Sequence, residues 1–250
     1  RIAGSDVLVS GSWFLVAALI AVLVAPRAED VAPGLGPWAY AVGFGFAVLL
    51  YGSVLLHEAS HAVVARLFGF RVSAITLHFL GGMTAIEGEA RRPRQEFWIA
   101  VVGPLTSIGV GLASLAVLPV TPDGLPRMAV EALAGANLLV GVLNLVPGLP
   151  LDGGRVLKSA VWTVSGDPHR ATLVAGWGGR VVAVLVLLWP VALELGLGRR
   201  PQLIDYAIAV IIAVFLWTGA GASIASARIR RRLPGLAARG LARRSLTVPA

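Results

Sequence analysis

Long apolar stretches separated by short polar segments run along the chain to about residue 227. A helix needs about 20 mostly apolar residues to cross a bilayer, so these stretches predict six membrane spans. The predicted spans are Val7–Ala25, Trp38–Phe68, Glu96–Val120, Met128 to about Val164, about Ala175 to Leu195, and Leu203–Ala227. The fourth is interrupted, and the chain shows no internal repeat.

One segment, Arg71–Ala90, differs from these spans. It reads RVSAITLHFLGGMTAIEGEA, is rich in β-branched residues and is broken by Gly81 and Gly82. This pattern predicts a short β-hairpin or re-entrant loop, which survives at membrane depth only where protein or a water cavity satisfies its backbone. The predicted fold is an all-α polytopic membrane protein with about six transmembrane helices and a small membrane-associated hairpin or sheet after the second.

Composition supports a membrane protein. The 250 residues are 57% hydrophobic and only 14% charged, whereas soluble domains carry about 25% charged residues. We expect one membrane domain over residues 1–227. Because the chain has no cysteine, it has no disulfide and no thiolate metal ligand. Any metal must be held by His, Asp or Glu.

The net charge of +8 is unevenly placed, since seven of the 21 basic residues lie between Arg228 and Arg244. Basic runs also occur in nucleic-acid-binding proteins, but beside an apolar span they are typical of a cytoplasmic end that faces anionic lipid. No other part of the chain resembles a nucleic-acid module. We therefore predict no nucleic-acid partner and a basic cytoplasmic tail over residues 228–250.

The remaining basic residues predict the orientation. Six spans place both ends on one side, and the positive-inside rule assigns the more basic side to the cytoplasm. The predicted inner segments hold Arg1, Arg66, Arg71, Arg91, Arg92, Arg94, Arg155, Lys158, Arg170, Arg180 and the tail. The predicted outer loops hold only Arg27, Arg127, Arg199 and Arg200. Both termini are therefore expected in the cytoplasm.

The stretch LLHEASHAVVARL, inside the second predicted span, carries a His-Glu-x-x-His motif. On a helix, His57 and His61 are four residues apart and share one face, so both imidazoles can bind one metal ion. Glu58 is close enough to reach a water molecule on that ion. Zinc suits such a site, with a third protein ligand and one open position. Intramembrane ionisable residues are rare and usually functional, which favours a metal site over chance.

The candidate third ligand is Asp152, in the stretch NLVPGLPLDGGRVL. Pro147 and Pro150 interrupt the helix here, and the nearby glycines let the backbone bend, as expected of a stretch that lines a site. Asp152 is also well placed to cap the helix segment that follows. The two roles are compatible.

Taken in order, HEASH, the Gly-Gly hairpin, GPLTS and NLVPGLPLDGG resemble the site-2 proteases, a family of intramembrane zinc metalloproteases, over about Val7–Ala227. The resemblance implies one Zn²⁺ per chain and assigns roles to eight residues. They are the zinc ligands His57, His61 and Asp152, the catalytic Glu58, the cleft residues Asn144 and Pro147 that hold substrate, and Gly81 and Gly82 in the turn of a sheet that clamps substrate. One departure is Ser107, where the family often has Asn, which affects packing rather than catalysis.

The short spacing between the motifs, without an inserted PDZ domain, resembles the six-helix branch whose members often carry cytoplasmic CBS domains. The terminal ARRSLTVPA resembles the start of such a domain. We expect the rest of it, and with it a nucleotide-sensing function, to be missing from a chain trimmed at both ends. A homodimer is an assembly that the sequence leaves open.

The expected function is that of an intramembrane zinc endopeptidase in a bacterial plasma membrane. It would cut a transmembrane substrate, such as a membrane-bound sigma-factor regulator or a signal-peptide remnant. The substrate must unwind, and Ile75–Leu80 is predicted as an edge strand that captures it. A non-proteolytic metal transporter or sensor is the alternative, and a scaffold without activity a third. His78 is expected on the wet face of the hairpin, with a contact to substrate or metal left open.

Overall fold

The computed structural model describes residues 5–78, 81–198 and 200–232. Six of its helices are long and apolar enough to cross a membrane, which confirms the predicted number of spans. The elements in chain order are β1 (Asp6–Val9), α1 (Gly11–Val31), α2 (Trp38–Leu67), β2 (Arg71–His78), β3 (Gly81–Glu87), α3 (Pro93–Val117), a 3₁₀ turn (Leu118–Val120), α4 (Leu125–Asn144), α5 (Asp152–Ser165), α6 (Pro168–Leu197) and α7 (Leu203–Arg232).

The first predicted span begins too early and ends too early. Residues 6–9 form the strand β1, and the helix starts only at Gly11, after the side chain of Ser10 accepts a hydrogen bond from the backbone N–H of Ser12. An N-cap serine of this kind stops the strand and starts the helix. The apolar residues Val7 to Val9 therefore belong to the sheet.

The fourth predicted span is in fact α4 followed by a separate helix, α5. With 14 residues, α5 is about 21 Å long, too short to cross a bilayer. The loop over residues 145–151 separates the two helices and folds tightly against its surroundings, since a Cβ at Gly154 would lie 2.7 Å from the carbonyl oxygen of Gly148. The six-span count holds because α6 begins at Pro168 and supplies the fifth span.

The small sheet has the order β1-β2-β3. Strand β2 runs antiparallel to β3, with His78 opposite Gly81, and parallel to β1, with Ala74 opposite Asp6. The predicted sheet after the second helix is confirmed, with one strand more than a hairpin. The prediction of Ile75–Leu80 as an edge strand is wrong, because β2 is the central strand; Leu80 itself lies outside the described residues. Among the described strands, β3 presents the edge next to the metal motif.

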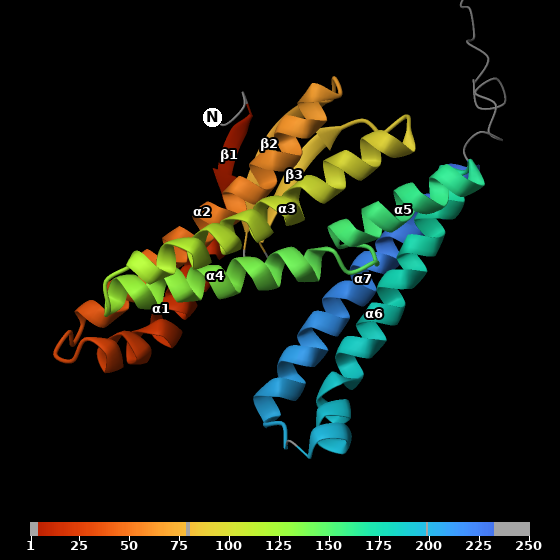
Figure 1. Ribbon diagram of the computed structural model, residues 1–250. Coiled ribbons are helices and arrows are strands. Elements are labelled where there is room, and N and C mark those ends of the chain that lie inside the picture. Colours follow the sequence, from red (N-terminus) through yellow and green to blue (C-terminus); the bar gives the residue numbers. More distant parts are fainter. Residues whose placement is uncertain (1–4, 79–80, 199, 233–250) are drawn as a thin grey trace, which may run out of the picture.

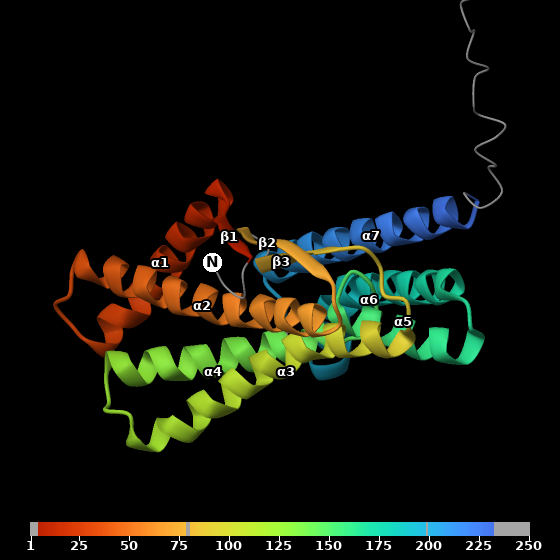
Figure 2. The same ribbon diagram turned by 90° about the horizontal axis from the view of Figure 1, so that it is seen from above.

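The helices form two groups (Figures 1 and 2). Helices α1 to α4 pack in sequence order with the sheet on α2, while α6 and α7 form an antiparallel hairpin. The short helix α5 packs on both α3 and α6 and so joins the groups. Small residues allow close crossings: a Cβ at Gly43 would lie 2.7 Å from the Cα of Ala21, where α2 meets α1. Because Asp152 opens α5, it stands where the two groups meet.

Candidate metal centre and active site

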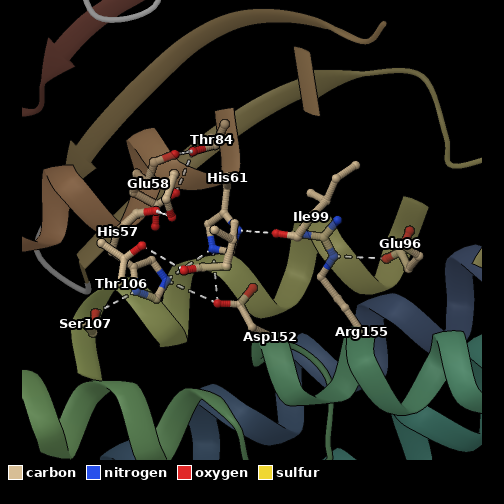
Figure 3. A network of polar contacts seen from close by, with 12 residues as sticks. His57, Glu58, His61, Thr84, Glu96, Ile99, Thr106, Ser107, Asp152 and Arg155 are labelled. Atoms are coloured by element: carbon tan, nitrogen blue, oxygen red, sulfur yellow. Dashed lines mark hydrogen bonds and ion pairs between the residues drawn. The ribbon is translucent and has the colours of Figure 1, made fainter. Parts of the chain in front are cut away.

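Three side chains converge between α2 and α5 (Figure 3). His57 and His61 project from one face of α2, and Asp152 is the first residue of α5. The Nε2 atoms of the two histidines lie 3.2 Å apart, and each lies 3.2 Å from Oδ2 of Asp152. Both histidines are buried and Asp152 is half-buried. The three predicted ligands are therefore brought together.

The hydrogen bond at Nδ1 of each imidazole orients the ring so that Nε2 faces the centre. Nδ1 of His61 is bonded to the carbonyl oxygen of Ile99, which can only accept, so Nδ1 carries the hydrogen. In the neutral ring its Nε2 then presents a lone pair. Nδ1 of His57 lies 2.8 Å from Oγ of Ser107, a partner that allows the same tautomer. With this tautomer in both rings, two lone pairs and a carboxylate oxygen meet, an arrangement that a cation stabilises.

The dimensions fit zinc. Two ligands of a tetrahedral zinc ion with bonds of about 2.0 Å lie about 3.3 Å apart. The observed triangle, with three sides of 3.2 Å, has this size before any adjustment. A set of two nitrogens and one carboxylate oxygen leaves a fourth position open, as in catalytic rather than structural zinc sites.

Helix α3 packs closely against the two histidines at Gly103, next to the nitrogens that face the centre. A Cβ at Gly103 would lie 2.6 Å from Nε2 of His57 and 2.5 Å from Cε1 of His61. No residue other than glycine fits without displacing the ligands. Ser107, one turn further along α3, is buried and orients His57, so it takes a direct part in holding the site.

The carboxylate of Glu58 contacts the sheet. Its side chain is 8% exposed, and its Oε2 accepts a hydrogen bond of 2.7 Å from Oγ1 of Thr84 in β3. The same hydroxyl lies 3.0 Å from the carbonyl oxygen of Glu58. A Cβ at Gly82 would lie 2.9 Å from Cδ of Glu58, so β3 touches the carboxylate directly. The carboxylate of Glu58, the residue after His57, is thereby held in one position without belonging to the group of metal ligands.

A buried ion cluster holds α5 in place. Glu96 in α3 is 6% exposed and accepts bonds from Arg155 (Nε, 3.0 Å) and from Lys158 (Nζ, 3.5 Å), both in α5. Glu96 lies about one turn before Ile99, whose carbonyl orients His61. Helix α3 therefore aligns a metal ligand on α2 and anchors the helix that carries Asp152.

The other predicted residues lie around this centre. Asn144 ends α4 and is half-buried, and Pro147 is exposed in the loop before α5. Gly81 and Gly82 begin β3, and Gly81 lies opposite His78. His78 ends β2, and its carbonyl oxygen accepts a hydrogen bond of 3.3 Å from Tyr51.

Sequence reasoning missed four residues around the centre: Gly103 abuts the two histidines, Thr84 contacts Glu58, and the Glu96–Arg155 pair anchors α5. Glu96 offered one signal, as an acid at the edge of a predicted span, which is rare unless paired or functional. Thr84 gave no signal, since its contact with Glu58 depends on where the sheet lies.

In a chain with six candidate spans, two histidines, an aspartate and a nearby buried glutamate form a candidate catalytic metal site. The family model for Peptidase family M50 matches residues 45–124 and 121–188, a region that includes all four residues. This chain belongs to peptidase family M50.

Individual relatives agree with this family assignment. The chain is 44% identical over 151 residues to the provisionally named zinc metalloprotease Rip3 of Mycobacterium tuberculosis, covering 58% of this chain and 38% of that protein. It is 33% identical over 241 residues to sll0528 of Synechocystis, also provisionally named a zinc metalloprotease, covering 92% of this chain and 60% of that protein. The solved site-2 protease from Methanocaldococcus jannaschii superposes with a TM-score of 0.59 at 26% identity, covering 90% of this chain and 93% of that one.

The chain thus spans about four to six tenths of the length of these curated relatives. The donor set fits zinc, the metal that the names of these relatives give, and His57, His61 and Asp152 could hold such an ion.

Proposed function

We propose that this protein is an intramembrane zinc endopeptidase, which hydrolyses peptide bonds in or near transmembrane segments of its substrates. The observation that carries the proposal is the placement of Glu58 beside, but not among, three converging metal ligands in a domain of six candidate spans. Membrane-bound regulators of sigma factors and signal-peptide remnants are the substrates that the resemblance suggests.

In this proposal Glu58 is the general base. When bound, zinc supplies the Lewis acidity that brings the pKa of a coordinated water to near 7. Glu58 takes the proton of the attacking water and returns it to the leaving amine. Thr84 holds the Glu58 carboxylate in one orientation through the 2.7 Å hydrogen bond. Asn144, at the end of α4, contributes a polar side chain to the cleft and helps to hold the substrate backbone.

The substrate is proposed to bind in extended form along β3. A transmembrane helix pairs its own peptide groups, so it must unwind before a peptide bond is exposed. The open edge of β3 offers backbone groups for strand addition. Since Gly82 and Thr84 of that strand touch Glu58, a segment added there would pass next to the base. Pro147, exposed on the loop before Asp152, is the second residue proposed to hold the substrate.

We further propose a plasma-membrane location in a bacterium, with both termini in the cytoplasm, on the arginine distribution and the six spans. Residues 1–227 would be the protease domain and residues 228–250 a basic tail; Arg1, Arg199 and the tail beyond residue 232 lie outside the described residues. A homodimer and a nucleotide-sensing CBS domain after the tail stay predictions.

A metal transporter or sensor is the second candidate. Transport would call for ligands in succession along a path, whereas the described residues hold one such group, His57, His61 and Asp152. Simple metal transfer also requires no general base, whereas Glu58 is buried and held by a hydrogen bond from Thr84.

The test compares purified wild-type protein with Glu58→Gln in cleavage of a single-span substrate, with bound zinc quantified in both. We expect one zinc per chain in each and cleavage only by the wild type, because Glu58 is not a ligand. Zinc binding without cleavage by either form, across several substrates, would instead favour the transporter or sensor.

A further inference from the structure

Arg180 is a charged residue that the proposed chemistry does not use. It lies in the interior of α6, in a candidate membrane span. Its guanidinium carbon lies 4.8 Å from the ring centre of Trp177 in α6 and 4.8 Å from that of Trp217 in α7. Its Nε is buried and has no hydrogen-bond partner. In the described part of the chain no carboxylate forms an ion pair with it.

The side chain faces away from the metal centre. A Cβ at Gly178 would meet the carbonyl oxygen of Pro147, and one at Gly219 would meet the ring of Pro150, so these glycines mark the faces of α6 and α7 toward the active-site loop. Arg180 lies two residues after Gly178 in α6, and Gly221 lies two residues after Gly219 in α7, so each is turned by about 200° around its helix from that glycine. A Cβ at Gly221 would lie 3.9 Å from the guanidinium of Arg180. The cation therefore lies on the opposite side of the hairpin.

That side is open to the surroundings. Trp177 is 51% exposed and Trp217 is 46% exposed, although both lie in candidate spans and next to a charge. On a membrane protein this surface meets lipid. The active-site loop that ends at Asp152 packs on the other side, so a substrate bound at that loop would not be the counter-ion of Arg180.

An unpaired guanidinium in a span is costly, and the two indoles compensate for only part of the lost hydration. A helical side chain leans toward the start of its helix, so Arg180 reaches toward the Pro168 end of α6. The exposed Arg228, near the end of α7, lies toward the same end of this antiparallel hairpin, which the arginine distribution assigns to the cytoplasm. Lipid phosphates are the anions available there.

We propose that Arg180, Trp177 and Trp217 form a binding site for the phosphate group of an anionic phospholipid, seated on the outer face of the α6–α7 hairpin. The guanidinium donates paired hydrogen bonds to the phosphate oxygens, while the two indoles fix its plane. The acyl chains lie along the apolar surfaces of the two helices. Local thinning of the bilayer and the reach of the side chain bring the headgroup to this depth.

The site is coupled to the active-site loop. Gly178 and Gly179, directly before Arg180, pack against carbonyl oxygens of Pro147 and Leu149. A lipid that anchors α6 at Arg180 therefore restrains the loop that ends at Asp152. We expect anionic lipid to raise cleavage through this contact, a consequence that rests on the proposed function.

Binding is tested first, by native mass spectrometry of the protein released from detergent with added phosphatidylglycerol. Arg180→Gln removes the guanidinium, Arg180→Lys keeps the charge but not the planar fork, and Arg228→Gln removes an exposed charge nearby as the control. We expect wild type and Arg228→Gln to retain lipid equally, and both Arg180 variants to retain about tenfold less. Equal retention by all four forms, or full retention by Arg180→Lys, would overturn the site.

A second arm separates a lipid from free phosphate. Inorganic phosphate added at millimolar concentration should leave the lipid complex of the wild type intact. Its displacement of the lipid, with phosphate retained in its place, would contradict a lipid site.

The coupling is tested in vesicles of phosphatidylcholine with or without phosphatidylglycerol. Cleavage by wild type and Arg228→Gln should rise with the anionic lipid, while cleavage by Arg180→Gln should be the same in both. A rise of equal size in Arg180→Gln would contradict the coupling. No cleavage by wild type in any vesicle would contradict the proposed protease function and would leave the binding result to stand alone.

Discussion

Replacing Gly103 by Ala should remove zinc from the protein. The added Cβ would lie 2.6 Å from Nε2 of His57, and ordinary van der Waals contact begins at 3.4 Å, so the imidazole must retreat by about 0.8 Å. The same atom also meets the ring of His61, whose Nδ1 is tied to Ile99. Both ligand nitrogens are therefore displaced at once. A displacement of this size is large against the tolerance of about 0.2 Å in zinc–ligand bonds.

We expect zinc affinity to fall at least about 100-fold, the upper range for changes next to metal ligands. The assay is zinc content per chain after dialysis against chelators of graded strength. Gly109→Ala is the matched control, since Gly109 lies in the same helix and a Cβ there would have no neighbouring atom within 4 Å. If Gly103→Ala retained zinc against every chelator as Gly109→Ala does, the proposed geometry of the centre would be refuted.

Three further predictions concern the base, the anchor of α5 and the substrate. Thr84→Val should lower kcat about tenfold with zinc content and KM unchanged, because the hydroxyl only orients Glu58, and Thr84→Ser should restore kcat. Thr76→Val in the neighbouring strand serves as the control. An equal loss of kcat in Thr76→Val would point to a general effect on the sheet. Glu96→Gln should reduce the free energy of unfolding by about 2 kcal/mol and weaken zinc binding, since Arg155 and Lys158 lose their buried charged partner. Chemical denaturation with and without zinc measures the stability and the contribution of zinc to it. Unchanged stability would show that the cluster does not anchor α5. A substrate span with a central Gly or Pro should be cut faster than a poly-Leu span, because it unwinds more easily; equal rates would exclude unwinding as a requirement.

The sequence was sufficient to predict the spans and the three side chains that the structure brings together, for different reasons. Each span is a local run of apolar residues, so its existence does not depend on tertiary contacts. The two histidines share a helix face whatever surrounds them. Asp152 was recognisable because Pro147, Pro150 and the nearby glycines mark an irregular stretch at membrane depth.

Other features depend on contacts between distant residues. Val7 to Val9 are apolar and looked like the start of a span, but they pair with Ile75 to Leu77 as the strand β1. That pairing makes β2 central and moves the open edge to β3. The contact of Thr84 with Glu58 follows from the position of β3 over α2, which no local pattern specifies. Helix α5 similarly looked like the end of a span, because the tight fold of the loop before it depends on contacts that no local pattern shows.

The most direct test of the central claim is metal-dependent cleavage of a single-span substrate in a bilayer, with the cut bond located by mass spectrometry. The protein is stripped of metal by a chelator and then titrated with zinc. We predict that cleavage disappears, returns in full at one zinc per chain, and falls within or next to the membrane segment of the substrate. Cleavage that survives complete removal of zinc, or that falls only in a soluble part of the substrate, would contradict an intramembrane zinc protease.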